Sequence, residues 1–174
     1  MVRFLIPSVA VLLFLLEPEF AMLSPIEVSG HIYYLVPRFL ILYLIFISIY
    51  YSRQRAVMYG LFFGVLYDVF YIDIIGLYSV LYPLICFLAG SIVKIIHQHL
   101  VVTTTISVVL VAILEFVLYQ FFYLIAFTTI PLTEFLQSRL LPTIIANTLF
   151  LMILGWAFKY LINARVLQRA REVS

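Results

Sequence analysis

The chain has 174 residues, of which 66% are hydrophobic and only 10% are charged, and its mean hydropathy is +1.21. A soluble domain is about half apolar and about 25% charged, so this composition excludes a soluble enzyme and indicates an integral membrane protein. The net charge of +2 is too small to indicate a nucleic-acid partner, and a single cysteine, Cys86, excludes a disulfide framework or a cysteine metal site.

Six apolar runs predict an all-α membrane protein that forms a single polytopic domain over residues 1–174. A helix needs about 20 mostly apolar residues to cross ~30 Å of hydrocarbon. The expected spans are residues 2–22, 32–51, 56–72, 77–96, 101–127 and 136–161. Residues 162–174 form a short basic cytoplasmic tail, for which contact with anionic lipid headgroups is preferred to contact with a cytoplasmic partner.

The first run also resembles a signal peptide, because Arg3 precedes the apolar stretch FLIPSVAVLLFLL. The residues that follow, EPEFAMLSP, offer no cleavage site with two small residues in the required spacing. We therefore expect an uncleaved first helix.

The third run carries the sequence YGLFFGVLYDVFYIDIIG, in which Gly60, Gly64 and Asp68 recur every four residues and lie on one helix face. The spacing Gly-x-x-x-Gly lets two membrane helices approach closely, but the residues leave open whether the neighbouring helix belongs to this chain. The apolar connection after this run predicts a tight hairpin with the fourth run. Asp68 is expected to position helices there, either by accepting backbone hydrogen bonds from residues 71–76 or by pairing with a membrane arginine.

Polar side chains inside the runs are the candidate functional residues, because an ionisable group in a membrane span costs at least ~2.5 kcal/mol and needs a partner. Besides Asp68, they are Glu17, Arg38, Glu115, Arg139 and Asn147, the last because it lies on one helix stripe with Arg139 and Thr143. A rise of 1.5 Å per residue places them in the outer half of the bundle. They form either an outward-opening polar pocket for a small ligand or an internal salt-bridge network that fixes helix register. The second interpretation is preferred, since polar contacts between membrane helices are often only structural.

The ten Lys and Arg residues predict the orientation of the chain, because positive residues concentrate on the cytoplasmic side of a membrane. With the N-terminus inside, only Arg38 and Arg139 fall toward the outer side. The others fall on the inner side: Arg3, Arg53, Arg55, Lys94, Lys159, Arg165, Arg169 and Arg171. The sequence therefore predicts a multi-pass protein with both termini in the cytoplasm.

Catalytic and metal-binding functions are disfavoured by where the polar residues lie. An intramembrane aspartyl protease needs a second membrane aspartate, but the only other aspartate, Asp73, lies five residues beyond Asp68 in the adjoining loop. A serine protease needs a membrane-embedded histidine, and all histidines fall at span ends. His97 and His99 point to different faces of a helix and have no third ligand nearby. We expect no catalytic residue, metal or cofactor.

Short motifs along almost the whole chain resemble one known family. VPRFLILYLIF, YGLFFGVLYDVFY with IGLYSVLYPL after it, LEF and PTIIAN are similar to the rod-shape-determining MreD proteins of bacteria. The most specific element is Gly-x-x-x-Gly-x-x-x-Asp with a glycine eight residues later, matched here by Gly60, Gly64, Asp68 and Gly76. Arg38 and the RQR loop are most similar to the Gram-positive, Bacillus-type branch.

This resemblance implies a non-enzymatic scaffold in the bacterial plasma membrane that acts in cell-wall elongation and controls rod shape. The implied partners are MreC, a single-span protein with a large extracytoplasmic part, and, directly or indirectly, the actin-like MreB, a SEDS-family glycan polymerase and a class B transpeptidase. Membrane lipids are a further partner, and a homo-oligomer stays open.

The resemblance also implies a helix arrangement similar to the substrate-binding S components of energy-coupling-factor transporters, which keeps a second function open: a vitamin-type binding subunit of a transporter. A ligand site predicts a cavity whose polar groups lack partners. A scaffold predicts acids and arginines that satisfy one another and a small-residue face open to another chain. S components often carry Ala-x-x-x-Ala on the first helix, and VAVLLFLLEP lacks it, which favours the scaffold.

Overall fold

The computed structural model describes residues 4–72, 74–93 and 99–173, with side chains described as far as residue 168. Arg3, Asp73, Lys94 and His97, which the sequence singled out, lie outside the described residues, as do the side chains of Arg169 and Arg171. The elements in chain order are α1 (Leu5–Ala21), β1 (Ile26–Val28), β2 (His31–Tyr33), α2 (Phe39–Tyr50), α3 (Arg53–Tyr67), α4 (Leu77–Ile92), α5 (Leu100–Leu124), α6 (Leu132–Phe135) and α7 (Leu141–Val173).

Two π-helical turns merge neighbouring elements. Asp68–Ile72 continues α3, and Leu136–Leu140 joins α6 to α7. The described residues therefore form six continuous helical segments. Arg53–Ile72, Leu100–Leu124 and Leu132–Gln168 are long and apolar enough to cross a membrane, and Phe39–Tyr50 and Leu77–Ile92 are shorter apolar helices. The expected helical membrane protein with six helical segments is confirmed, while the individual crossings and the cytoplasmic termini stay predictions.

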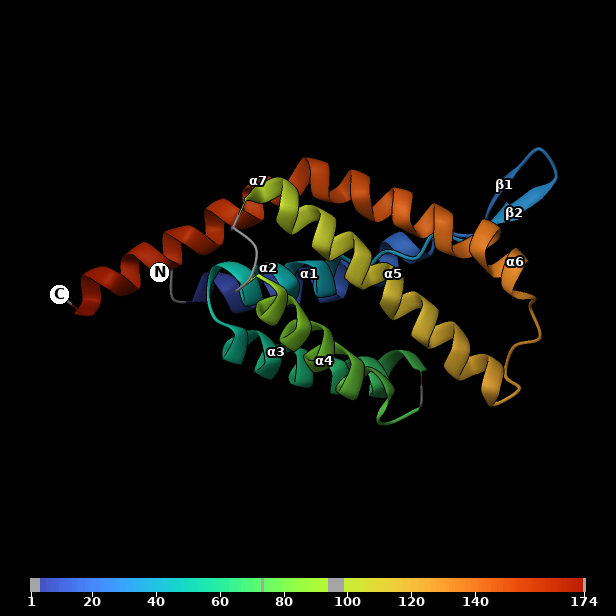
Figure 1. Cartoon of the computed structure of the whole chain (residues 1–174), viewed down its shortest axis with the longest axis horizontal. Helices are drawn as coiled ribbons and strands as arrows, with labels where there is room; N and C mark the ends of the chain where they lie inside the picture. The colour runs from blue at the N-terminus through green and yellow to red at the C-terminus, as the bar shows by residue number, and fades with distance from the viewer. Residues whose placement is uncertain (1–3, 73, 94–98, 174) are drawn as a thin grey trace.

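The helix α2 is the centre of the bundle. It packs against α1, α3, α4, α5 and α7, and residues 40–47 have no exposed surface. Its sequence, FLILYLIFISIY, explains this position, because a helix with apolar side chains on all its faces can pack against other helices on all of them. Figure 1 shows α2 between the α3–α4 hairpin along one edge of the molecule and α7 along the other.

The second expected span is shorter as a helix than its apolar run. The run begins at residue 32, but residues 31–33 form β2 and helix begins only at Phe39. Pro37 explains the late start, because a proline lacks an N–H group and disfavours helical dihedrals at the residue before it. Residues 34–38, called the extended segment below, therefore connect the hairpin to α2 without helical hydrogen bonds.

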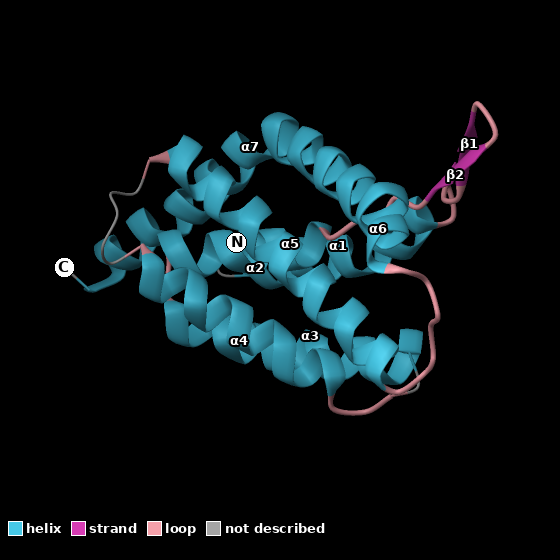
Figure 2. Cartoon of the chain, turned by 45° about the vertical axis from the view of Figure 1, so that its right-hand side comes forward, coloured by secondary structure: helices cyan, strands magenta, loops and turns pink. Residues whose placement is uncertain are grey.

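The β-hairpin was not expected from the apolar runs. Its two central residues, Ser29 and Gly30, both have positive φ, at 53° and 80°, as a two-residue type I′ turn requires. The strands pair antiparallel with Ile26 opposite Tyr33. Figure 2 shows the hairpin projecting from the helical bundle beside α6.

The last helical segment is longer than the sixth expected span. Helix begins at Leu132 and continues without a break to Val173, so the basic tail of residues 162–174 prolongs the same helix as far as the structure describes it. Figure 1 places the start of α1 and the end of α7 at one end of the molecule and the β-hairpin at the other.

Candidate functional site

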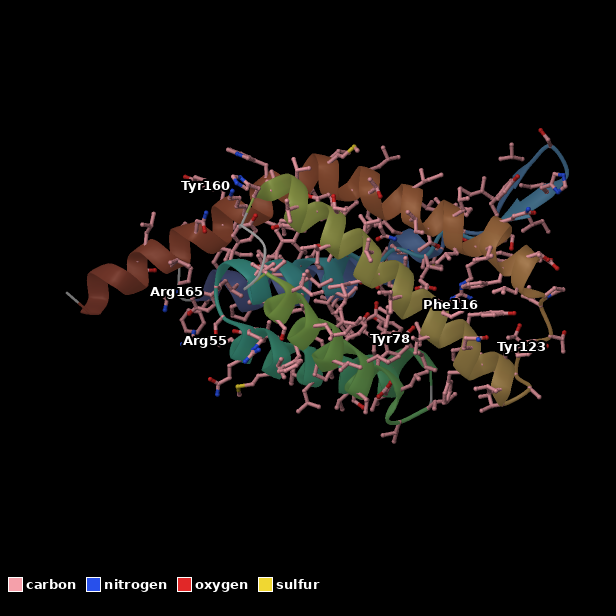
Figure 3. The ribbon with its side chains drawn as sticks, viewed as in Figure 1. Arg55, Tyr78, Phe116, Tyr123, Tyr160 and Arg165 are labelled. Atoms are coloured by element: carbon pink, nitrogen blue, oxygen red, sulfur yellow. The ribbon has the colours of Figure 1, made fainter. Side chains whose placement is uncertain are left out.

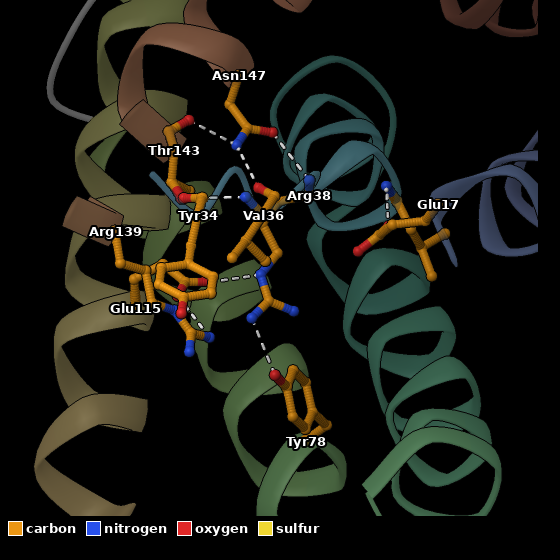
Figure 4. Close-up of polar contacts among 10 residues, drawn as sticks. Glu17, Tyr34, Val36, Arg38, Tyr78, Glu115, Arg139, Thr143 and Asn147 are labelled. Atoms are coloured by element: carbon orange, nitrogen blue, oxygen red, sulfur yellow. Dashed lines mark hydrogen bonds and ion pairs between the residues drawn. The ribbon is translucent and has the colours of Figure 1, made fainter. Parts of the chain in front are cut away.

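An ion pair between Arg38 and Glu115 lies at the heart of the bundle. The Arg38 Nε atom is 2.5 Å from Glu115 Oε1, and the two side chains are 4% and 1% exposed. Arg38 also donates from Nη2 to the Tyr78 hydroxyl at 2.9 Å, as Figure 4 shows. The pair joins the start of α2 to α5, and Tyr78 adds α4. Charges this deeply buried are tolerated only when they are paired.

Arg139 extends this pair into a chain of three charged side chains. Its Nη2 atom is 3.6 Å from Glu115 Oε2, and its side chain is 45% exposed. Arg139 lies in the π-helical turn before α7, which turns the guanidinium toward the bundle beside Glu115 (Figure 4). Arg38, Glu115 and Arg139, which the sequence predicts as one cluster, therefore do meet.

Glu17, from α1, holds the N-terminus of α2. Its Oε2 atom accepts a hydrogen bond from the Leu40 backbone N–H at 3.1 Å. That N–H is in the first turn of α2, where backbone donors have no partner within the helix and a carboxylate is favoured by the helix dipole. Glu17 is 3% exposed, and its other oxygen, Oε1, has no hydrogen-bond partner among the described residues.

Asn147 and Thr143, on α7, bind the extended segment. Asn147 accepts from the Arg38 N–H and donates to the Val36 carbonyl, both at 2.9 Å. Thr143 accepts from the Val36 N–H at 3.1 Å. Non-helical backbone at membrane depth is tolerated only where its polar groups are satisfied inside the protein. The polar stripe on α7 therefore replaces the helical hydrogen bonds that the extended segment lacks.

Asp68 lies apart from the arginines and stabilises the start of α4. Its carboxylate accepts hydrogen bonds from three backbone N–H groups: those of Gly76 at 2.9 Å, Tyr78 at 2.7 Å and Ser79 at 3.0 Å. The sequence left two roles open for Asp68, hydrogen bonds from the backbone or an ion pair with an arginine. The structure shows the hydrogen bonds, and their donors include residues of α4 as well as the turn before it. The turn itself needs Gly76, whose φ of +114° is strained for any residue with a Cβ.

Gly60 and Gly64 bring α3 and α4 together. A Cβ placed on Gly60 would lie 2.9 Å from the Pro83 backbone nitrogen, and one on Gly64 would lie 2.7 Å from the Ser79 Cα and closer still to the Tyr78 carbonyl. The open question of which helix these glycines contact is thus answered: α4 of the same chain fills both notches. A face of small residues at Gly60 and Gly64 is not open to a partner.

A cavity of about 910 Å³ adjoins the charged cluster. Its walls come from the end of α1, the extended segment, the α3–α4 turn, the end of α5 with the following loop, and the turn before α7. Glu17, Arg38, Tyr78 and Arg139 line it. The structure thus contains an internal salt bridge and, beside it, a mostly apolar cavity with a few charged lining residues.

Two site residues were missed by the sequence reasoning, Tyr78 and Tyr67. Tyr78 bonds to Arg38, and the Tyr67 phenol lies beside the Glu17 carboxyl. Both rings belong to a stacked aromatic group on the α3–α4 hairpin. Their signal in the sequence was weak, because a tyrosine in an apolar helix is as common at a membrane interface as beside a buried charge.

No group of three metal-ligating side chains is found within the part of the chain that the structure describes. The buried charged residues Glu17, Arg38, Asp68 and Glu115 instead join one helix to another. Fold and site together define a helical membrane protein whose core contains a buried ion pair and carboxylates that cap helices.

The comparisons with known proteins place the chain in a family. Residues 2–165 match the profile of rod shape-determining protein MreD, and the chain belongs to this family. It is 35% identical over 159 residues to the rod shape-determining protein MreD of Bacillus subtilis (strain 168), an alignment that covers 91% of this chain and 92% of the relative. No solved structure matches the chain. Membership assigns the chain a role in determining cell shape.

Proposed function

We propose that the chain is a non-enzymatic scaffold in the bacterial plasma membrane that controls rod shape by binding an MreC-type single-span protein. Through that partner it acts on the peptidoglycan elongation machinery of MreB, a SEDS polymerase and a class B transpeptidase. The family match over residues 2–165 carries this proposal. Both termini are proposed to be cytoplasmic, which follows from the distribution of Lys and Arg.

The geometry supports a rigid scaffold in one respect and changes the proposal in another. Arg38 pairs with Glu115, and the Asp68 carboxylate is satisfied by backbone groups, as a scaffold requires. The glycine face is filled by α4, so the partner must bind elsewhere. The surfaces that remain are the apolar outer faces of the helices and the exposed β-hairpin, residues 26–33.

The test is depletion of the protein in its own host, followed by measurement of cell width and of MreC recovered with a tagged copy. Rods that widen and round, together with recovery of MreC on the tagged protein, support the scaffold. Normal cell width after complete depletion contradicts it.

A second function, a small-molecule-binding subunit of a transporter, is favoured by one observation, the 910 Å³ cavity with a buried, unpartnered carboxyl oxygen of Glu17. The same depletion distinguishes the two functions. Lost vitamin uptake at normal cell width selects the transporter subunit, whereas changed shape at normal uptake selects the scaffold.

A further inference from the structure

Two polar groups on the wall of the cavity are left without a full set of partners. The first is Glu17 Oε1, which is buried and accepts no hydrogen bond from any described residue. The Tyr67 phenol lies beside this carboxyl as a nearby donor, but no hydrogen bond to Oε1 has the usual distance and angle. A buried acceptor without a donor is costly, so a ligand that donates a hydrogen bond to this oxygen gains binding energy.

The second group is the Arg139 guanidinium. It has five N–H donors, yet its contact within the described residues is an ion pair of 3.6 Å with Glu115, longer than a hydrogen bond. Its side chain is 45% exposed, and it lines the cavity. Arg139 therefore retains the capacity to bind an anion in a fork-like geometry.

The charges of this cluster balance, which limits the net charge of a ligand. With both carboxyl groups ionised, Arg38 and Arg139 carry two positive charges and Glu17 and Glu115 carry two negative ones. A ligand with a net charge would add an uncompensated charge to a buried site, where such a charge is costly. A ligand that carries one charge of each sign leaves the balance unchanged.

The rest of the wall is apolar and aromatic. Tyr71, Phe122, Phe127, Ile130 and Phe135 all line the cavity. Ligand sites typically have volumes of about 300–1,000 Å³ and combine such walls with a few polar groups. The cavity, at about 910 Å³, is larger than the charged part of a small zwitterion needs, and its remaining walls suit an apolar group.

We propose that this cavity binds a zwitterionic amphiphile, with the ammonium group of the ligand at Glu17 and its carboxylate or phosphate at Arg139. Two sources share this chemistry: an aminophospholipid headgroup that enters from the bilayer, and an amino acid or short peptide that enters from water. The inference rests on the cavity and not on the scaffold role, so either can fail without the other.

The test uses the full chain purified in detergent and four compounds in two matched pairs. A short-chain phosphatidylethanolamine is compared with the phosphatidylglycerol of equal chain length, which lacks the ammonium group. The dipeptide Ala-Phe is compared with its N-acetyl form, which lacks it too. Binding is measured by isothermal titration calorimetry and by the rise in unfolding temperature that a ligand of the folded state produces.

Variants locate the binding site. Glu17→Gln keeps an acceptor for the Leu40 N–H but removes the negative charge, and Arg139→Gln removes the anion-binding group. Each is expected to weaken binding by about tenfold or more, since a hydrogen bond to a charged group contributes about 1.5–3 kcal/mol. Arg55→Gln is the matched control, because Arg55 is exposed and contacts Tyr51 away from the cavity. Arg139→Gln serves alone if Glu17→Gln is poorly produced.

Binding of a zwitterion, with weaker binding of its matched compound and of the variants, supports the proposal. Selective binding of the phospholipid assigns the source to the bilayer, and selective binding of the dipeptide assigns it to water. Binding of all four compounds with equal affinity, unchanged binding by the Glu17 and Arg139 variants, or binding of none of the compounds overturns the proposal.

Discussion

Asp68 and Glu17 have the same structural role at two places in the molecule. Each is a buried carboxylate that accepts hydrogen bonds from the first turn of a helix to which it does not belong, α4 for Asp68 and α2 for Glu17. The unpaired N–H groups and the positive end of the helix dipole compensate the negative charge. Asp68 is thus held in its span by backbone N–H groups, without an ion pair to any described residue.

Replacement of Asp68 is expected to destabilise the protein in proportion to the acceptors that are lost. Asp68→Ala leaves three backbone N–H groups without their acceptor and should lower the free energy of unfolding by about 1–3 kcal/mol or more. Asp68→Asn retains one carbonyl oxygen and should fall between Asp68→Ala and the wild type. The measurements are the unfolding temperature in detergent and the amount of protein in the membrane. Glu134→Ala, at an exposed acid, is the control for charge and should behave as wild type.

The Arg38–Glu115 pair is expected to be costly to break but replaceable as a unit. Glu115→Leu removes the carboxylate partner of the buried Arg38, and Arg38→Met leaves Glu115 with only its 3.6 Å contact to Arg139. Each single variant should therefore destabilise the protein by about 3–5 kcal/mol. The double variant removes both charges and should recover part of that loss. Unfolding of all four proteins in detergent gives the coupling energy. A double variant no more stable than the worse single variant contradicts this account.

At the scale of elements, the α3–α4 hairpin depends on backbones that touch. Gly60 and Gly64 leave no room for a Cβ against Pro83 and Ser79, so van der Waals contact between the helices replaces a hydrophobic driving force that lipid does not supply. The hairpin presents Tyr78 to Arg38, and its packing therefore also determines the geometry of the charged cluster.

Substitution of these glycines should separate the two helices. Gly60→Ala and Gly64→Ala are expected to destabilise by about 1–3 kcal/mol, the usual cost of overpacking, and Gly64→Leu by more. Gly155→Ala is the matched control, because a Cβ there would lie 3.6 Å from the Phe46 ring, an ordinary contact. For each variant, the unfolding temperature in detergent and the amount of MreC recovered from cells are compared with those of the wild type. Equal effects at Gly64 and Gly155 would show that close packing at the hairpin is not what stabilises it.

The extended segment depends on α7 in a similar way. Asn147→Leu removes both hydrogen bonds to the backbone of Val36 and Arg38 and should destabilise by about 1–3 kcal/mol for each buried group left unpaired. Thr148→Val, one residue on, removes a hydroxyl that bonds within its own helix and should have little effect. Loss of stability in Thr148→Val as large as in Asn147→Leu would contradict a specific role of the stripe. Unfolding in detergent measures both.

At the scale of the whole molecule, the start of α1 and the end of α7 lie at one end, and the β-hairpin at the other (Figures 1 and 3). Arg55, Tyr160 and Arg165 lie at the first end in Figure 3. The charged cluster and the cavity lie toward the hairpin. If the first end is cytoplasmic, the cavity faces the outside of the cell.

Thiol labelling in a Cys86→Ser background tests this orientation. A membrane-impermeant reagent should label Ser29→Cys, at the exposed tip of the hairpin, in intact cells. Arg55→Cys, exposed at the other end, should be labelled only after lysis. The reversed pattern would place both termini outside and the cavity toward the cytoplasm.

The sequence by itself determined the class of the protein, its six helical segments, and which side chains carry charge inside them. These features depend on composition and on local periodicity, and both can be read from the sequence without knowledge of the fold. The sequence also predicted a polar cluster of Glu17, Arg38, Glu115, Arg139 and Asn147, because buried charges in a membrane need partners. Of these, Arg38, Glu115 and Arg139 are joined by ion pairs.

Only the tertiary structure decided how those residues are used. In the structure α2 lies at the centre of the bundle, and Asp68 accepts hydrogen bonds from the backbone at the start of α4. One oxygen of Glu17 has no hydrogen-bond partner among the described residues and lies beside a cavity. The physical reason is distance along the chain: Asn147 binds the Val36 carbonyl across 111 residues, and Glu115 meets Arg38 across 77. Such contacts depend on how the helices pack, and no local pattern of residues encodes them.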